Sequence, residues 1–333
     1  MKVCIVGAGA IGGWVGTKLA ASGAAQVSAL ARRDTLTALR THGWRMLERG
    51  TLVQAPVHAD DDASRLGVHD VVVIAVKGPA LQQVAAQIRP LIGPHTLVVP
   101  AMNGVPWWFC HGLDGFGSRP LTSVDPGGQI AAAISFEQVI GCVVHVSCAV
   151  PEPGLVDHKM GNRLIIGEPF GGSDTTARVR QLGALFAQAG IDAEISENVR
   201  QDIWFKLWGN LTMNPISAFT GATVDQILAD PLTRAFCTSA MEEAAAIGAR
   251  IGCRIDQSPE DRHAVTAKIG AFRTSMLQDV DAGRAIELDA IVGAVHEIGR
   301  TLGMPCPSID ALMGLTRLFG RVHGLYPEAS APG

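Results

Sequence analysis

The chain opens with the apolar run Lys2-Val3-Cys4-Ile5-Val6 and continues into the turn Gly7-Ala8-Gly9-Ala10-Ile11-Gly12. A helical pattern follows from Trp14 to Ala21. In a G-x-G-x-x-G turn of this kind, the first glycine allows a tight turn, the second lets the backbone approach a pyrophosphate, and the third permits close helix packing. Because a helix N-terminus would face the phosphates, the stretch predicts dinucleotide binding. A glycine-rich turn that binds nothing is the alternative.

Further along the N-terminal half, short β-branched runs alternate with helical stretches, which is typical of a parallel sheet with crossover helices. Besides Val3–Val6, the predicted strands are Val27–Ala31, Val71–Val76, Thr96–Pro100, Val139–Val146, Leu164–Ile166 and Asp192–Ile195. A helix is expected from about Thr175 to Ala189. Together these segments predict a Rossmann-type α/β domain over residues 1–197.

The pattern changes at Asn198 to long segments of helical period with few strand signals. Examples are Ala235–Ile251, Ala264–Val280 and Ile286–Leu302. We therefore expect an all-α C-terminal domain over residues 198–333.

Composition narrows the class of protein. Hydrophobic residues make up 47% of the 333 residues and charged ones 17%, which favours a globular chain. A net charge of −4 gives no general attraction for nucleic acid or for an anionic membrane. The seven cysteines form no zinc-ligand spacing, and no apolar run is long enough for a membrane helix or a signal peptide, so we expect a cytoplasmic protein without a metal site.

The residue that contacts the adenosine ribose is expected about twenty positions after the glycine turn, at the end of the second strand. Arg32 stands there, followed by Arg33. An acidic residue would hydrogen-bond the free 2′-hydroxyl of NAD, whereas a guanidinium can pair with the 2′-phosphate of NADP. The sequence thus favours NADPH, unless the arginines are simply solvated or paired with Asp34.

Two later strand ends should face the same crevice. Lys77 follows Val71–Val76, and Asn103-Gly104 follows Thr96–Pro100. A surface lysine and a plain turn are the alternatives, but these positions favour contacts with cofactor or substrate.

A polar stripe interrupts an apolar helical segment in the second half. Lys206, Asn210 and Asn214 recur at every fourth position and share one helical face spanning about 80°. Pro215 is expected to end or bend this helix. The polar groups either line a site or reach the edge of a packed helix.

A second cluster contains Ser275 and, at the start of the next helical segment, Glu287. Taken alone, Ser275 could be an ordinary helix residue and Glu287 a first-turn acid favoured by the helix dipole. Only the combination with the stripe favours a site.

Together these segments resemble the ketopantoate reductase family over essentially the whole chain. The residues that carry the resemblance are Gly7, Gly9, Gly12, Arg32, Lys77, Asn103, Lys206, Asn210, Asn214, Ser275 and Glu287. The spacing of Ser275 and Glu287 and the segments Asp125–Gly128 and Pro151–Gly154 are also similar to the family's.

The resemblance implies a helical domain like the C-terminal domain of 6-phosphogluconate dehydrogenase, and NADPH-dependent reduction of ketopantoate to (R)-pantoate in pantothenate biosynthesis. It implies a general acid at Lys206, with Asn210, Asn214 and Ser275 holding the 2-oxo acid. Glu287 and Asn103 would bridge cofactor and substrate, Glu287 also taking part in catalysis. Hydride transfer to C2 generates an alkoxide, which an ammonium within hydrogen-bond reach stabilises and protonates. A homodimer packed through helical domains is compatible with the sequence.

Two departures put the exact substrate in question. The run Thr220–Val224 lacks an asparagine that shorter members carry, and Val292 stands where an asparagine often occurs. The alternatives are a reductase of another 2-oxo acid, a 3-hydroxyacid dehydrogenase and a non-catalytic NADPH-binding sensor. The Ser275/Glu287 pair argues against the dehydrogenase. A short-chain dehydrogenase is excluded because the only tyrosine, Tyr326, has no lysine four residues later.

Overall fold

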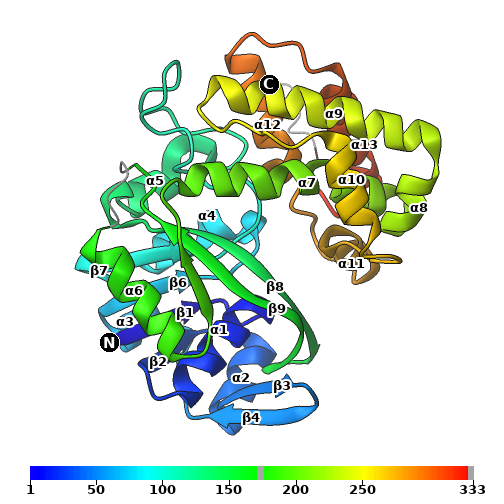
Figure 1. Cartoon of the computed structure of the whole chain (residues 1–333). Coiled ribbons are helices and arrows are strands. Elements are labelled where there is room, and N and C mark those ends of the chain that lie inside the picture. Colours follow the sequence, from blue (N-terminus) through cyan, green and yellow to red (C-terminus); the bar gives the residue numbers. More distant parts are fainter. Residues whose placement is uncertain (171–175, 329–333) are drawn as a thin grey trace. The chain divides into compact units, whose positions relative to one another are not determined.

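The computed structural model describes residues 1–170 and 176–328 and divides them into two compact units (Figure 1). One unit comprises Met1–Phe109 and Gly128–Asp202; the other comprises Cys110–Gly127 and Ile203–Gly333. The predicted domain boundary after Glu197 lies slightly before this division, and it stays a prediction. No sequence pattern indicates that residues 110–127 belong with the helical unit.

The first unit contains a five-stranded parallel sheet in the order β5-β2-β1-β6-β7. Its strands are β1 (Lys2–Val6), β2 (Gln26–Leu30), β5 (His58–Asp60), β6 (His69–Ile74) and β7 (Ile92–Pro100). The central strand β1 is fully buried at Val3 and Ile5, as expected for a strand covered on both faces. The predicted Rossmann-type sheet is therefore confirmed. The edge strand β5 was missed because three residues give no periodic signal.

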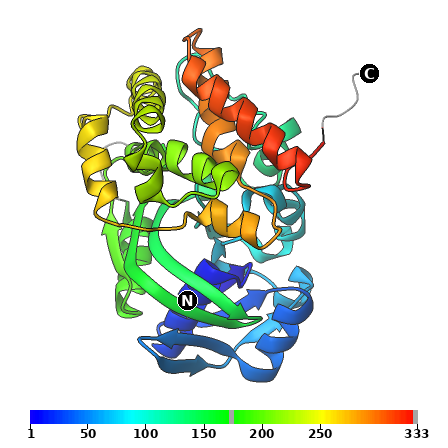
Figure 2. The same cartoon turned by 90° about the vertical axis from the view of Figure 1, so that its right-hand side faces the viewer.

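A second sheet lies in the same unit and was only partly predicted. Its order is β10-β9-β3-β4, with β8 paired to β9. The strands are β3 (Trp44–Glu48), β4 (Thr51–Ala55), β8 (Gly141–Glu152), β9 (Leu155–Gly167) and β10 (Asp192–Ile195). Figure 2 shows the long β8–β9 hairpin in green. The expected strands at 139–146 and 164–166 were too short, because the half-exposed ends of the hairpin carry mixed polar residues.

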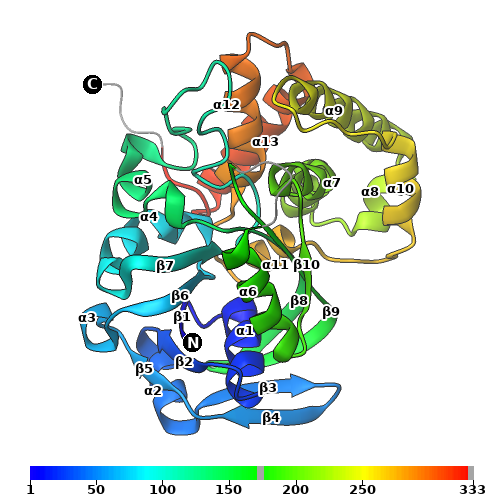
Figure 3. The ribbon, with the colours of Figure 1, turned by 60° about the vertical axis from the view of Figure 1, so that its left-hand side comes forward.

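Helix α1 (Ala10–Ala21) packs between the two sheets (Figure 3). Glycines permit this close approach: a Cβ atom at Gly13 would lie 2.5 Å from Val156 on β9, and one at Gly16 would lie 2.6 Å from the Trp44 ring on β3. Trp14 and Trp44 are themselves buried in this core. The glycines of α1 are therefore required for packing the helix between the two sheets, in addition to the glycines required by the turn before it.

The remaining helices of this unit flank the sheets. They are α2 (Arg33–His42), α3 (Ala63–Leu66), α4 (Gly78–Gln87), α5 (Gln129–Ala133) and α6 (Ala177–Gln188), with 3-10 turns at Arg89–Leu91 and Phe136–Gln138 and a further one, Pro126–Gly128, at the boundary of the units.

The second unit is helical, as predicted. Its elements are α7 (Val199–Thr220, whose first turn belongs to the other unit), α8 (Val224–Ala229), α9 (Pro231–Arg250), α10 (Pro259–Ala267), α11 (Ser275–Asp281), a π-helical stretch (Asp289–Gly293), α12 (Ala294–Thr301) and α13 (Pro307–Val322). Across the described residues, no helix is both long and apolar enough to cross a bilayer.

The expected single helix Ala264–Val280 is wrong, because α10 and α11 are separate. Gly270 adopts a left-handed φ of 74°, which helical backbone does not allow. Thr274 then caps α11 by accepting a hydrogen bond of 3.2 Å from the Leu277 N–H. These two local signals end one helix and start the next.

Candidate active site

The glycine turn has the backbone geometry that its sequence requires. Gly7 has a φ of 91°, and its N–H donates to the Leu30 carbonyl at 3.1 Å. A Cβ atom at Gly12 would lie 2.0 Å from the Gly7 carbonyl oxygen, so only glycine fits there. At Gly9, in contrast, a Cβ atom would have no neighbour within 4 Å among the described residues. The loop is therefore closed on its inner side and open at Gly9.

The N-terminus of α1 opens at the same place. Gly9 is the N-cap and is solvent-exposed, and the first turn carries no charged side chain. Ala8 is buried, whereas Ala10 and Ile11 are half-buried. Free N–H groups at a helix start and its positive dipole end suit a pyrophosphate. The residues present thus fit a dinucleotide.

The other candidate cofactor residues follow strands of the same sheet. Arg32 is the N-cap of α2 after β2, Lys77 is the N-cap of α4 after β6, and half-buried Asn103 follows β7. Since parallel strands end at one edge, the structure brings these residues to the edge that carries the glycine turn. The order in which successive strands are added reverses between β1 and β6, which is where ligands of such parallel sheets bind.

Arg32 is exposed, and its guanidinium donates to the Gln87 side chain at the end of α4. Arg33 follows with a φ of 51°, a left-handed value that is unusual for a residue other than glycine. The strained turn keeps two adjacent guanidinium groups at the end of β2.

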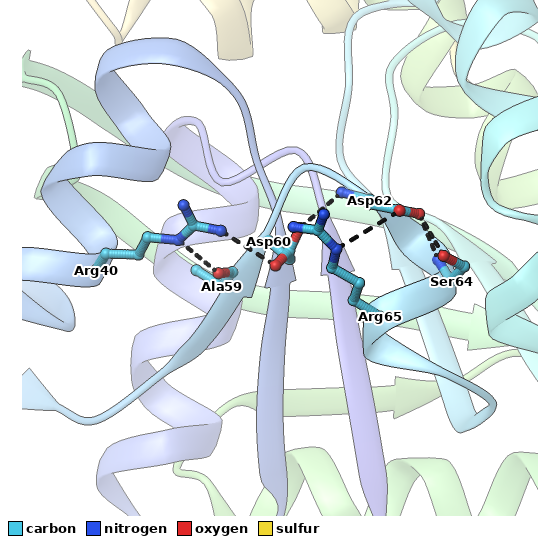
Figure 4. Close-up of polar contacts among 6 residues, drawn as sticks. All are labelled: Arg40, Ala59, Asp60, Asp62, Ser64 and Arg65. Atoms are coloured by element: carbon cyan, nitrogen blue, oxygen red, sulfur yellow. Dashed lines mark hydrogen bonds and ion pairs between the residues drawn. The ribbon is translucent and has the colours of Figure 1, made fainter.

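A charged cluster beside Arg32 was missed by the sequence reasoning (Figure 4). Asp60 ends β5, and its carbonyl accepts from the Ala31 N–H at 3.0 Å. The Asp60 carboxylate lies 3.1 Å from Arg40 and 3.7 Å from Arg65. A backbone N–H from Asp62 and the two guanidinium groups hold the pKa of Asp60 below its usual value, although partial burial opposes this. The carboxylate beside the predicted ribose position is therefore ionised but balanced by cations.

Helix α7 is held in one rotational setting by two tryptophans. The Trp204 Nε1 donates to the Ala244 carbonyl at 3.2 Å, and the Trp208 Nε1 donates to the Met241 carbonyl at 2.7 Å. Both rings are 1% exposed and both carbonyls belong to α9. Gly248 leaves room for this contact, because a Cβ atom there would lie 2.2 Å from Trp204 Nε1.

This setting turns the polar stripe away from α9. At 100° per residue, the centre of the Lys206, Asn210 and Asn214 stripe lies about 140° around the helix from the midpoint of the two tryptophans. Lys206 and Asn210 are half-buried, and Asn214 is only 6% exposed. The stripe thus passes from half-buried positions at Lys206 and Asn210 to a buried one at Asn214.

Pro215 does not end the helix, because α7 continues to Thr220; of the two expected outcomes, a bend stays a prediction. A proline inside a helix costs about 3 kcal/mol. Burial of Ile216, Ser217 and Ala218 after it offsets this cost through packing.

The remaining candidates lie at helix starts of the same unit. Ser275 is the exposed first residue of α11, and Glu287 is half-buried just before the π-helical stretch. The regular helix expected over Ile286–Leu302 is wrong, since residues 289–293 have π geometry. Among the described residues no group of side chains could hold a metal ion.

Two family models match the chain. The one described as "Ketopantoate reductase PanE/ApbA" matches residues 3–170, and the one described as "Ketopantoate reductase PanE/ApbA C terminal" matches residues 198–319. The chain belongs to the ketopantoate reductase family. This result confirms the resemblance stated from the sequence, and it establishes an oxidoreductase with a dinucleotide-binding domain and a helical C-terminal domain.

Individual members of the ketopantoate reductase family are similar along their whole length. A 2-dehydropantoate 2-reductase from Mesorhizobium japonicum is 44% identical, with 98% of this chain and all of the relative covered. The crystal structure of a candidate ketopantoate reductase from Ralstonia solanacearum MolK2 has a TM-score of 0.93 at 54% identity, covering 98% and 99% of the chains. A D-mandelate dehydrogenase bound to NADH shares the fold, with a TM-score of 0.83 at 21% identity and coverage of 98% and 100%.

Proposed function

We propose that this chain reduces 2-dehydropantoate to (R)-pantoate with NADPH. The observation that carries the proposal is the stripe of Lys206, Asn210 and Asn214, set by buried tryptophans on a helix of a ketopantoate reductase family member. A 44% identical relative named for this activity supports the substrate.

NADPH, when bound, supplies the hydride for the substrate's C2 carbon. Gly7–Gly12 and the α1 N-terminus would hold its pyrophosphate, and Lys77 and Asn103 lie at the same sheet edge. Arg32 would pair with the 2′-phosphate, which favours NADPH over NADH. The neutralised Asp60 beside this position removes a repulsion that would oppose a phosphate dianion.

In the helical unit, Lys206 would donate a hydrogen bond to the C2 oxygen and then a proton to the alkoxide. Asn210, Asn214 and Ser275 supply amide and hydroxyl groups for the carboxylate and hydroxyl of the substrate. Glu287, with Asn103, would bridge substrate and cofactor. The half-buried position of Lys206 limits competition by water for these hydrogen bonds.

The test is NADPH oxidation with a panel of 2-oxo acids led by ketopantoate, repeated with NADH. We expect ketopantoate to give the highest kcat/KM, with NADPH preferred. Higher turnover of a bulkier 2-oxo acid would contradict the substrate and keep the reaction class; the substitutions at Val224 and Val292 make this the main alternative. Tight NADPH binding without turnover of any acid would instead indicate a sensor.

We also propose a homodimer packed through helical units. Leu315, Leu318 and Val322 form an exposed apolar stripe on α13, with 56%, 61% and 73% of their surfaces accessible. Such a stripe favours a partner surface. Light scattering would show twice the chain mass if the proposal holds. The cytoplasmic location remains a prediction.

A further inference from the structure

The turn after α13 folds back onto the segment that carries Glu287. The N–H groups of Leu325 and Tyr326 both donate to the Gly320 carbonyl, at 2.7 and 3.1 Å. The Leu325 carbonyl in turn accepts from the Ile286 N–H at 3.0 Å. Leu325 and Ile286 are 6% and 2% exposed, so this contact is shielded from water. Ile286, the residue before Glu287, is thereby fixed by the turn that follows α13.

Tyr326 fixes the other side of Glu287. Its hydroxyl donates to Asp289 Oδ1 at 2.6 Å, and Asp289 is the first residue of the π-helical stretch. The ring packs against Gly320, where a Cβ atom would lie 2.7 Å from the Tyr326 Cβ, and the Arg321 guanidinium lies 5.8 Å from the ring centroid. The only tyrosine of the chain is thus held in place by contacts with Asp289, Gly320 and Arg321.

The Tyr326 hydroxyl stabilises the charged form of the Asp289 carboxyl group, whose surroundings are poorly solvated. Burial raises the pKa of Asp289, and the Tyr326 hydroxyl opposes that increase together with the more distant charge of Arg317. Burial likewise raises the pKa of Tyr326, so the phenol remains a donor. A short π-helical stretch frequently marks a functional site, and here it begins two residues after Glu287.

We propose that Leu325 and Tyr326 are positioning residues for Glu287. Leu325 acts through the backbone of Ile286, and Tyr326 acts through the side chain of Asp289. Neither is assigned a contact with the substrate. They hold Ile286, directly before Glu287, and Asp289, two residues after it, as supporting groups around a reactive side chain do. The inference rests on the role proposed for Glu287 in ketopantoate reduction.

The first variant is Tyr326→Phe, which removes only the hydroxyl. We expect kcat/KM for ketopantoate to fall about tenfold, in the range for loss of a hydrogen bond to a charged group. The Kd for NADPH without substrate should change much less than kcat/KM, because the residues proposed to hold the pyrophosphate and the 2′-phosphate belong to the other unit. Asp289→Asn, which keeps an acceptor oxygen for the hydroxyl, should lose less activity than Tyr326→Phe.

A double-mutant cycle with Glu287→Gln separates positioning from general packing. If Tyr326 acts through Glu287, adding Tyr326→Phe to Glu287→Gln should cost less than about twofold in kcat/KM, since the shared interaction is already lost. If the loss of kcat/KM in the double variant equals the product of the losses in the two single variants, the proposal is overturned.

Thr316→Val is the matched control. It also deletes a buried hydroxyl on α13, one that donates to the Leu312 carbonyl at 2.7 Å. We expect a lower Tm and an unchanged kcat/KM. If Thr316→Val lost as much activity as Tyr326→Phe, the proposed positioning role of Tyr326 would also be overturned. Wild-type protein that binds NADPH but does not turn over ketopantoate would instead overturn the proposed function, and this inference with it.

Discussion

The sheet edge of the first unit and the polar face of α7 in the second present their chemistry in different ways. At the sheet edge, backbone geometry makes the site: Gly7, Gly9 and Gly12 shape a loop whose donors are N–H groups. On α7, side chains would make the proposed substrate site, and the hydrogen bonds of Trp204 and Trp208 set the rotation of the helix that carries them. Binding at the sheet edge should therefore be sensitive to an added Cβ atom, whereas activity that depends on α7 should be sensitive to the loss of a particular functional group.

The two regions also differ in charge. At the edge of the sheet, the guanidinium groups of Arg40 and Arg65 pair with the carboxylate of Asp60, and Arg32 and Arg33 follow the neighbouring strand β2. The stripe on α7 has a single cation among amides. A polyanionic cofactor suits the former and a small 2-oxo acid the latter.

The largest effect is expected from Lys206→Ala, which tests the side-chain region alone. Loss of the general acid should lower kcat by about 10²- to 10⁴-fold, while the Kd for NADPH stays nearly constant. Stopped assays of pantoate formation and fluorescence titration of NADPH measure the two quantities. Lys268→Ala, at an exposed position of the same unit, is the control. Unchanged turnover in the Lys206 variant would refute its role.

Substitutions of the glycine turn test the backbone region. Gly12→Ala places a Cβ atom 2.0 Å from a carbonyl oxygen, so the Tm should fall and NADPH binding should weaken more than about tenfold. Gly9→Ala meets no neighbour within 4 Å among the described residues, so its Tm should equal that of wild type. Its methyl group would still obstruct a pyrophosphate on the open side.

Calorimetry and cofactor titration distinguish these outcomes. If Gly9→Ala binds NADPH as tightly as wild type, the phosphate does not approach at Gly9, and the comparison between an open and a closed side of the loop is wrong.

A smaller effect is expected from Arg32→Ala, which tests cofactor choice within the sheet edge. Removing a guanidinium from the 2′-phosphate should weaken NADPH binding by about ten- to a hundredfold and NADH binding much less. Arg163→Ala removes an exposed arginine of the same unit that pairs with Asp192 and Glu194 on the other sheet, and it should leave the NADPH to NADH ratio unchanged. Equal losses for both cofactors would move the 2′-phosphate contact to another residue, with Arg33 the first to test.

Much of the fold was predictable because its signals are local. The strands at residues 2–6 and 69–74 contain the apolar runs 3–6 and 71–74, and the strand at residues 26–30 is mostly apolar. The change of period near residue 198 marks the helical half. Strands β3, β4 and β5 were not predictable, because they are short and take their order from pairing with distant strands. The break between α10 and α11 depends on one glycine and one capping threonine inside a continuous helical pattern.

The candidate residues were found from the sequence, but their surroundings were not. Spacing placed Lys206, Asn210 and Asn214 on one face, since helical periodicity is a property of the local chain. That this face points away from α9 depends on hydrogen bonds to Met241 and Ala244, more than thirty residues away. Sequence by itself determined the glycine turn, the arginine after the second strand and the polar stripe. Only the tertiary structure decided that cations balance Asp60 and that the turn after α13 contacts the segment around Glu287. Such contacts join segments that are far apart in the sequence, and their separation carries no periodic signal.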